Sequence, residues 1–370
     1  MNAHRHYLDC NATAPLRPEA RAAMISAMDQ LGNPSSVHAE GRTARSILDK
    51  ARARVASLAG VSPAAVYFTS GATEANNWAL VQGERRTAAY ADSHDSVLRE
   101  IDNRGGGILT VQPDGLVGTD ETVRAIEDHD ADLISVAAVN NETGVIQPVR
   151  ELAQECRRRF LLLHVDAVQA PGKLDLAHLL DSVSFATLSA HKLGGPPGVG
   201  ALIMVDGADP KPMLFGGGQE NRRRAGTENL IGIAGFGAAA EAVADSWESE
   251  ASRIGRLRDD LEDRLTSKCP GASIYGSDVA RVPNTSCIRM PGVAAETQVM
   301  ALDLAGVAVS AGSACSSGKV APSHVLRAMG ASETEASEAI RISLGWNTTG
   351  ADIDACVSAW TGLWQRKHAA

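Results

Sequence analysis

The chain has 370 residues, more than one ordinary hydrophobic core requires, so we expect two domains. Its composition is that of a globular protein, and its net charge of −9 argues against a nucleic-acid partner, which would require a basic face. The first residues lack the apolar core of a secretory signal, and no apolar run is long enough to span a bilayer, so we expect a cytoplasmic protein without a membrane partner.

Two helices are predicted near the start of the chain. Residues 17–31 carry Pro18 in the first turn and an apolar face, and residues 44–59 repeat the helical spacing until Gly60. Short apolar runs then alternate with helical patterns and predict strands at 66–68, 88–90, 108–111, 133–139, 161–165, 185–188 and 199–205. This alternation predicts an α/β domain with a mainly parallel sheet, whose ligands lie beyond the carboxyl ends of the strands.

The pattern changes near Ser252, where a long helix, a strand at 285–290 and shorter α/β pieces follow. We therefore predict a large cofactor-binding domain at 16–250 and a smaller α/β domain at 251–370. The N-terminal segment, 1–15, is expected to associate with the smaller domain.

Lys192 is the most informative residue of the chain. It ends the run Thr-Leu-Ser-Ala-His-Lys, one short strand-loop unit after the run Asp-Ala-Val-Gln that starts at Asp166. An amine near a buried acid suits a Schiff base with pyridoxal phosphate (PLP), in which the lysine holds the aldehyde and the acid holds the pyridinium nitrogen. This pair indicates carbanion chemistry on an amino acid.

Several polar segments are suited to bind the phosphate of such a cofactor. The segment 68–77 leaves a strand, turns through glycine and opens a helix, whose free N–H groups attract anions. Ser189 and His191 offer further donors. The glycine run 216–218 permits close backbone approach, and Thr227 precedes another helix. The alternatives are a plain strand-to-helix connection and a flexible surface loop.

Three further polar residues occur where a cofactor site is expected. An asparagine in the turn 140–144 is suited to bond a ring oxygen, although asparagine and glycine also favour a simple turn. His94 follows a predicted strand and suits stacking and proton transfer, or else a capping role. Arg341 lies within an apolar strand pattern, where it acts either as a clamp for a carboxylate or in a structural ion pair.

Cys315 is the second informative residue. The six cysteines are scattered without the spacing of a zinc site or a disulfide framework. Cys315 lies in the segment 310–319, which has almost no apolar bulk, whereas a nucleophilic thiol needs access and thiolate character. The alternative is an incidental free thiol. Cys10 lies in a possible approach to the site, and the cysteines that fit predicted helices or strands are Cys156, Cys287 and Cys356.

Taken together, these motifs resemble the cysteine desulfurases of the NifS/IscS type, within the class V aminotransferase group of fold-type I PLP enzymes. The resemblance runs nearly end to end, from Tyr-Leu-Asp at 7–9, through Gly-Asn-Pro-Ser-Ser-Val-His at 32–38, to Arg-Ile-Ser-Leu at 341–344. It implies a large domain with a seven-stranded type of sheet, mainly parallel, and a smaller C-terminal α/β domain that carries the Cys315 loop.

The resemblance also implies which residues hold PLP. Lys192 forms the Schiff base, Asp166 pairs with the pyridine nitrogen, and Gln169 and Asn141 contact the region of the ring oxygen. His94 stacks on the ring and acts as an acid/base. The residues that resemble phosphate ligands are Ala72, Thr73, Ser189 and His191, with Thr227 contributed by the neighbouring subunit of a homodimer.

By the same resemblance, L-cysteine is the substrate, and Asn33 and Arg341 contact its carboxylate. Lys192 removes the α-proton, and the Cys315 thiolate attacks the substrate sulfur, which leaves a persulfide on Cys315 and releases L-alanine. An iron–sulfur scaffold or another sulfur-acceptor protein is the implied partner, and no metal is implied.

One departure and several alternatives stay open. The family's usual acid before the ring-stacking histidine is Ser93 here, and Asp95 is a candidate to compensate for it. A selenocysteine lyase or another class V small-amino-acid aminotransferase is the alternative activity, although an aminotransferase needs no thiol at Cys315. A non-catalytic interaction protein on a retired PLP fold is disfavoured by the intact Lys192, Asp166 and Cys315.

Overall fold

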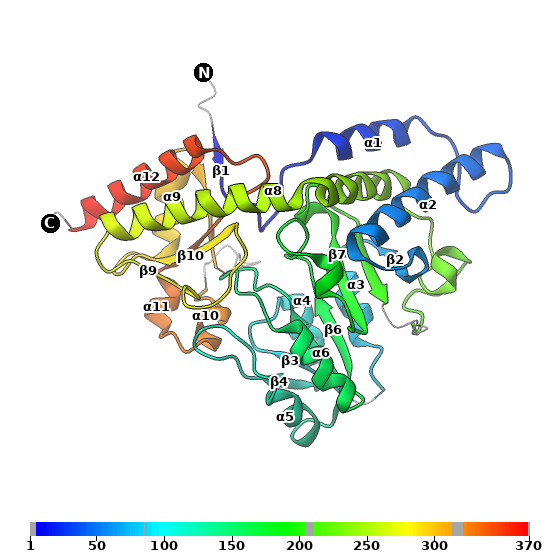
Figure 1. Ribbon diagram of the computed structural model, residues 1–370, viewed down its shortest axis with the longest axis horizontal. Coiled ribbons are helices and arrows are strands. Elements are labelled where there is room, and N and C mark those ends of the chain that lie inside the picture. Colours follow the sequence, from blue (N-terminus) through cyan, green and yellow to red (C-terminus); the bar gives the residue numbers. More distant parts are fainter. Residues whose placement is uncertain (1–4, 85, 205–209, 313–320, 369–370) are drawn as a thin grey trace.

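The computed structural model describes residues 5–84, 86–204, 210–312 and 321–368 (Figure 1). Its largest sheet has seven strands, in the order β2 (Val66–Thr69), β8 (Gly200–Met204), β7 (Phe185–Ser189), β6 (Leu162–Asp166), β5 (Ala131–Ala137), β3 (Arg86–Tyr90) and β4 (Gly107–Leu109). Only β8 runs antiparallel to its neighbours in this sheet, and the other pairs are parallel. The predicted mainly parallel sheet is confirmed, and each of the seven runs predicted as its strands contributes one.

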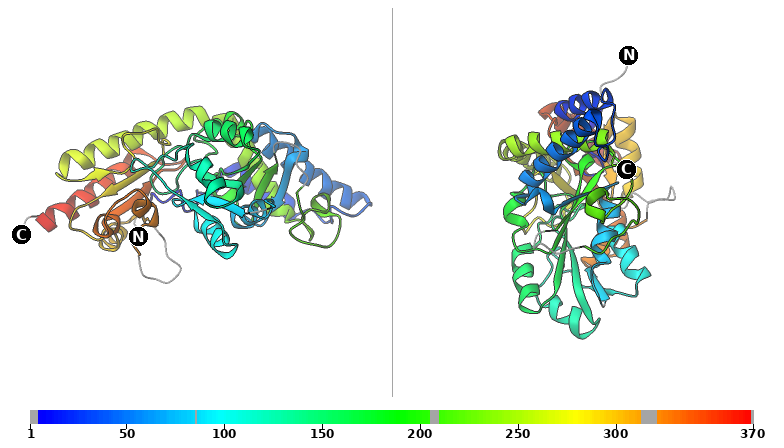
Figure 2. Two further views of the ribbon diagram at one scale, coloured as in Figure 1. Left: turned by 90° about the horizontal axis from the view of Figure 1, so that it is seen from below. Right: turned by 90° about the vertical axis from the view of Figure 1, so that its right-hand side faces the viewer.

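Helices cover both faces of the seven-stranded sheet, as the views in Figure 2 show. Alternate residues of β2 pack in opposite directions. Phe68 joins the core beneath the helices α2 (Ala39–Ala59), α6 (Val149–Arg158) and α8 (Leu230–Lys268), whereas Tyr67 packs with α3 (Ala72–Leu80) and α4 (Asp95–Asn103). Burial on both faces explains why these strands read as continuous apolar runs. The helices of this part of the chain are α1 (Pro18–Met28), α2 (Ala39–Ala59), α3 (Ala72–Leu80), α4 (Asp95–Asn103), α5 (Glu121–Glu127), α6 (Val149–Arg158) and α7 (Leu176–Leu179).

A second, four-stranded sheet is built mainly from the C-terminal part of the chain. Its order is β12 (Ser310–Ala311), β13 (Ala339–Ser343), β10 (Thr285–Arg289) and β9 (Ser273–Ile274). The strand β1 (His6–Tyr7) pairs in parallel with β11 (Val307–Ala308), and Leu8 is buried in the core of this region. The helices around it are α9 (Ala295–Leu304), α10 (His324–Ala328), α11 (Glu333–Ser337) and α12 (Gly350–His368).

The long helix α8 (Leu230–Lys268) reaches from one sheet to the other (Figure 1). The prediction that this helix starts near Ser252 is wrong, because three glycines near its true start weaken the helical pattern. A Cβ atom on Gly237 would lie 2.6 Å from the Cα of Ala51 in α2, so the glycine is required for close helix packing. Because α8 continues without interruption through residue 250, the division at that residue remains a prediction.

The helix α2 also begins earlier than predicted, at Ala39 rather than near residue 44. The ring of His38 caps it by accepting a hydrogen bond from the backbone N–H of Gly41 at 3.3 Å. Polar residues in the first turns hid this start from the apolar pattern.

The packing of α8 on α2 generates a stability prediction. Gly237→Ala should lower the free energy of unfolding by about 1–3 kcal/mol, because the new Cβ would overlap the α2 backbone. Gly255→Ala is the matched control in the same helix, where the nearest atom to a new Cβ is 3.4 Å away. This control should be neutral or up to about 1 kcal/mol more stable, through its helix propensity. Urea unfolding of the two variants checks the difference, and equal stabilities would contradict the packing argument.

Candidate active site

The carboxyl ends of two parallel strands bring the central residues of the site together. Asp166 is the last residue of β6, and Ser189 is the last residue of the neighbouring strand β7. Residue Asp166 pairs with Thr187 in the register of these strands, and the short helix η2 (Ala190–Lys192) follows β7 directly. The predicted acid and amine therefore lie at the same edge of the sheet, where ligands bind in this fold class.

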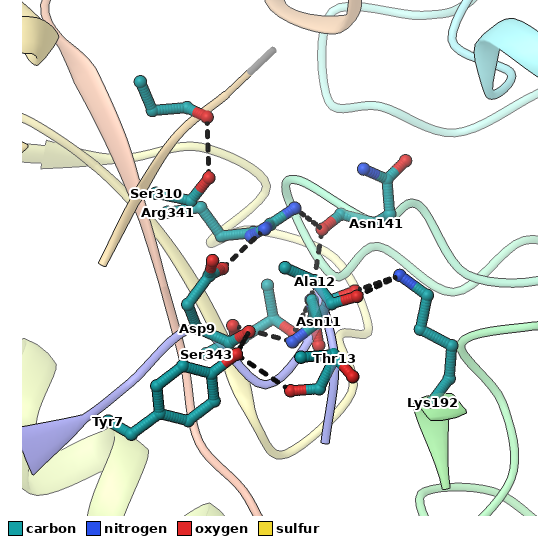
Figure 3. Close-up of polar contacts among 12 residues, drawn as sticks. Tyr7, Asp9, Asn11, Ala12, Thr13, Asn141, Lys192, Ser310, Arg341 and Ser343 are labelled. Atoms are coloured by element: carbon teal, nitrogen blue, oxygen red, sulfur yellow. Dashed lines mark hydrogen bonds and ion pairs between the residues drawn. The ribbon is translucent and has the colours of Figure 1, made fainter. Parts of the chain in front are cut away.

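The amine of Lys192 points into the N-terminal segment of the chain (Figure 3). Its Nζ donates hydrogen bonds to the backbone carbonyl oxygens of Asn11, at 2.5 Å, and of Ala12, at 2.9 Å. Burial is the main cause that lowers the pKa of Lys192 to about 8, and the nearby charge of Arg341 lowers it further. The carboxylates of Asp166 and Asp9 oppose this shift. The amine is therefore much more readily deprotonated than an exposed lysine.

Asp166 has a carboxylate that remains able to accept another donor. Its Oδ2 accepts a hydrogen bond from the Asn76 side-chain amide at 2.9 Å, and its Oδ1 accepts one from the Val168 backbone N–H at 3.1 Å. Each carboxylate oxygen has a further lone pair, and within the described ranges no cation forms an ion pair with Asp166. The carboxylate can therefore accept a hydrogen bond from the protonated ring nitrogen of PLP.

The start of α3 fits the phosphate of the same cofactor. Its N-cap residue is Gly71, and among the described side chains none caps this helix end. No atom would lie within 4 Å of a Cβ on Gly71, so space is open beside the free N–H groups of Ala72 and Thr73. Gly200 packs directly against Gly71 and pairs with Ser189, which brings Ser189 next to this helix start.

His191 lies beside Lys192 and is only partly buried. One ring nitrogen, Nδ1, is 3.3 Å from the hydroxyl of Thr13. Burial and the adjacent charge of Lys192 lower the pKa of His191 to about 4, so its ring is neutral at pH 7. A neutral imidazole can still donate one hydrogen bond, as a phosphate ligand requires.

Gln169 is oriented by Lys173, a residue that the sequence did not single out. Lys173 Nζ donates to Gln169 Oε1 at 2.8 Å, and Gln169 Nε2 donates to the carbonyl oxygen of Asn11 at 3.0 Å. A backbone carbonyl oxygen only accepts, so the contact with Asn11 fixes which end of the Gln169 amide is the nitrogen. Burial, and then the charge of Lys192, lower the pKa of Lys173 to about 7. No local sequence pattern marks a lysine that becomes buried in this way.

Arg341 is buried in β13 and joins the site from the four-stranded sheet (Figure 3). One terminal nitrogen donates to Asp9 Oδ1 at 2.7 Å, and the other donates to the backbone oxygen of Asn141 at 3.2 Å. The structure therefore contains the ion pair that was one of the two alternatives for Arg341. The side-chain amide of Asn141 points away from this guanidinium (Figure 3).

His94 is exposed and caps the start of α4. Its Nδ1 accepts a hydrogen bond from the backbone N–H of Ser96 at 3.1 Å and lies 2.8 Å from the Ser96 hydroxyl. The predicted compensation by Asp95 is not found: the described partner of the ring is Ser96, because the cap geometry directs Nδ1 toward the residue two positions later. The hydroxyl of Ser93 is buried and has no partner among the described residues.

Three predicted residues are not joined to this cluster by a described hydrogen bond. Asn33 and Thr227 are exposed, and Asn33 Oδ1 accepts a hydrogen bond from the Ser35 backbone at 2.9 Å. Cys315 lies outside the described residues. The chain leads toward it from beside Arg341, because Ser310 pairs with Arg341 between β12 and β13.

The described part of the chain shows neither a metal-binding cluster nor a membrane-spanning helix. There, no group of three His, Cys, Asp or Glu side chains is arranged to hold a metal ion. None of the described helices is both long and apolar enough to cross a membrane.

Comparisons with known proteins agree with this geometry. A model of the family described as aminotransferase class-V matches residues 6–356. A cysteine desulfurase of Cereibacter sphaeroides is 41% identical over 369 residues, which covers 95% of this chain and 93% of the relative.

Two solved structures are also similar. A NifS-like protein of Rickettsia africae ESF-5 has a TM-score of 0.90 and 34% identity, covering 98% of this chain and 100% of its own. A structure of SspA in complex with cysteine has a TM-score of 0.79 and 28% identity, covering 93% of this chain and 100% of its own. The first of these matches confirms the predicted fold-type I architecture. The family match and these identities show that the chain belongs to the aminotransferase class-V family.

Proposed function

We propose that this protein is a PLP-dependent cysteine desulfurase, which moves the sulfur of L-cysteine onto its own Cys315 and releases L-alanine. The observation that carries the proposal is that Lys192, Asp166 and Arg341, from two sheets, lie close together beside the N-terminal segment. The similarity to cysteine desulfurases, and to a structure that contains cysteine, supports the choice of substrate.

Enzymes of this family use PLP, which supplies an electron sink for a carbanion on a bound amino acid. Lys192 would hold the aldehyde of the cofactor and accept the α-proton of the substrate, and its lowered pKa supports both tasks. Asp166 would hold the ring nitrogen, and Gln169 and Asn141 would contact the region of the ring oxygen. The phosphate would be held at the start of α3 by Ala72 and Thr73, together with Ser189 and His191.

Arg341 binds the substrate carboxylate, together with Asn33. A guanidinium has five N–H donors, and the contacts of Arg341 with Asp9 and Asn141 leave donors for a carboxylate. Its Nε has no partner among the described residues although it is buried. His94 stacks on the cofactor ring.

The other cysteines support Cys315 as the sulfur acceptor by elimination. All five described cysteines are buried and free, and burial raises the pKa of each thiol. Even Cys10, which lies close to the site, has its pKa raised to about 12. A nucleophilic thiolate needs the opposite environment. Cys315 is the remaining cysteine of the chain.

The active unit is a homodimer, with Thr227 donated to the phosphate site of the other subunit. Large exposed apolar side chains support this assembly, and they lie along α1, the segment after it and the segment at 214–215: Ile25, Met28, Leu31, Val37, Leu214 and Phe215. The segment after α1 lies close to the chain that follows residues 214–215, because Gln219 Nε2 is 3.5 Å from the hydroxyl of Ser35. A group of exposed large apolar side chains is typical of a protein interface.

The enzyme acts in the cytoplasm, where free thiols persist, and an iron–sulfur scaffold or another sulfur-acceptor protein takes the persulfide sulfur. We retain the division into 1–15, 16–250 and 251–370 as part of this proposal. The separate buried cores of the two sheets support it.

The first prediction concerns Cys315. After incubation with L-cysteine, mass spectrometry of the purified enzyme should find one added sulfur atom on the peptide that contains Cys315. Cys315→Ser should lose sulfide and persulfide formation while it keeps the absorbance of bound PLP, because the thiol is not a cofactor ligand. Cys10→Ser, at a buried thiol with a raised pKa, should keep the sulfur transfer. Desulfuration by the Cys315→Ser variant would refute the assignment.

The second prediction concerns the pH dependence of cofactor capture. Only an unprotonated amine attacks an aldehyde, and the pKa of Lys192 is lowered from 10.5 to about 8. The rate at which PLP-stripped protein captures PLP should therefore rise about tenfold per pH unit below pH about 8 and level off above it. Stopped-flow absorbance measures this rate. Lys192→Ala should capture none, and Lys268→Ala, at an exposed lysine, should keep the profile. A rate that still rises tenfold per unit up to pH about 10 would contradict the lowered pKa.

The third prediction concerns the assembly. Phe215→Asp should convert the dimer to a monomer in sedimentation velocity experiments, because it introduces a charge into the apolar contact. Phe160→Asp makes the same change at another exposed phenylalanine, after α6, and should leave the dimer intact. A monomeric parent protein, or equal effects of the two substitutions, would exclude this interface.

A further inference from the structure

His94 and Asp166, two residues on different elements, are connected by a continuous chain of hydrogen bonds. Asn76 Nδ2 lies 2.9 Å from Asp166 Oδ2 and 2.9 Å from the Ser96 hydroxyl. The Ser96 hydroxyl lies 2.8 Å from His94 Nδ1. Asn76 is buried in α3, and Ser96 is partly buried in the first turn of α4.

The direction of every bond in this chain is fixed by its two ends. At one end, the backbone N–H of Ser96 can only donate, so His94 Nδ1 must accept and carries no proton. At the other end, the Asp166 carboxylate can only accept, so the Asn76 atom that faces it must be the amide nitrogen. Asn76 thus donates to both neighbours, and the Ser96 hydroxyl donates to His94. The oxygen of Asn76 has no partner among the described residues.

The consequence for His94 is a single neutral tautomer. With Nδ1 occupied by two donors from Ser96, the ring proton resides on Nε2, the nitrogen at the far end of an exposed ring. The ring therefore offers an N–H donor and has no free lone pair on Nε2. For Asp166, the consequence is a carboxylate plane that is held by the Asn76 amide.

We propose that Asn76 and Ser96 are positioning residues that orient both Asp166 and His94 in the cofactor site. Asn76 orients the Asp166 carboxylate, and through Ser96 it holds His94 as the Nε2–H tautomer, so that His94 acts as a neutral stacking group and hydrogen-bond donor. This inference rests on the proposed function, in which Asp166 and His94 bind the cofactor. The hydrogen-bond chain itself exists independently of any ligand.

The test uses the full-length protein with only its histidine rings labelled with 15N, with and without added PLP. A His94→Gln spectrum identifies the resonances of His94. The parent protein should show an unprotonated Nδ1 and a protonated Nε2 on His94 in both states. Ser96→Ala should shift the Nδ1 resonance, and Ser96→Thr, which keeps the hydroxyl, should restore it. A protonated Nδ1 in the parent protein would overturn the inference.

Ser93→Ala is the matched control, because it deletes a hydroxyl next to His94 that has no partner among the described residues. It should leave the His94 resonances unchanged. Asn76 contacts neither ring nitrogen of His94, yet Asn76→Ala should shift the Nδ1 resonance through Ser96. The same substitution should weaken PLP binding about tenfold, the loss expected for one hydrogen bond to a charged group. Equal shifts from Ser93→Ala and Ser96→Ala, or no effect of Asn76→Ala on either measurement, would refute the chain.

These outcomes separate the two proposals. If the parent protein fails to bind PLP but shows the Nε2–H tautomer, the proposed function fails and the hydrogen-bond chain stands. If PLP binds normally and His94 carries its proton on Nδ1, the positioning role fails and the proposed function stands.

Discussion

Asn11 lies where the two sheets meet, and almost every polar atom of this buried residue bonds to a different part of the chain. Its carbonyl oxygen accepts hydrogen bonds from Lys192 and Gln169, which belong to the large sheet. Its backbone N–H and side chain bond to the four-stranded sheet and its flank, at Ser343, Thr285 and Asn284, and its side chain also donates to the backbone of Asn141. Buried networks of this kind fix geometry when each member is satisfied. Asn11 therefore ties the amine of Lys192 and, through the backbone oxygen of Asn141, the guanidinium of Arg341 to one point.

The same region gathers buried positive charge. Lys192, Lys173 and Arg341 lie within electrostatic range of one another, and the carboxylates of Asp9 and Asp166 oppose the lowering of the pKa of Lys192. Burial of charge is costly, and the two lysines respond by releasing protons near neutral pH, whereas an arginine cannot. An anionic ligand would reduce this strain, so the electrostatics of the site favour a phosphate and a carboxylate. A deprotonated Lys192 is also what an attack on an aldehyde requires, so one physical cause serves both binding and chemistry.

The strands and the edge at which Asp166 and Lys192 meet could be predicted from sequence, because fully buried parallel strands appear as apolar runs and their carboxyl ends share one edge. The start of α8 could not be predicted, because its glycines lower the local helical preference. Only the close contact of Gly237 with Ala51 explains why a glycine occurs there. The partner of His94 was missed for a similar reason. The hydrogen bond from the Ser96 backbone N–H to the His94 ring depends on the direction of the backbone, which the residue types at 95 and 96 do not indicate. Lys173 and Asn76 act through tertiary contacts alone.

Arg341 shows that two alternatives from sequence need not compete. A structural ion pair and a carboxylate clamp appeared to be different roles, yet the contact with Asp9 uses only one of the donors of the guanidinium. Without Asp9, the buried guanidinium would lose its ion-pair partner, at a cost typical of broken buried pairs, about 3–5 kcal/mol. Asp9 therefore stabilises Arg341 before a ligand arrives, and it holds the guanidinium in one orientation. The ion pair is then the means by which the clamp is preorganised, and the carboxylate of a substrate meets a donor that is already fixed.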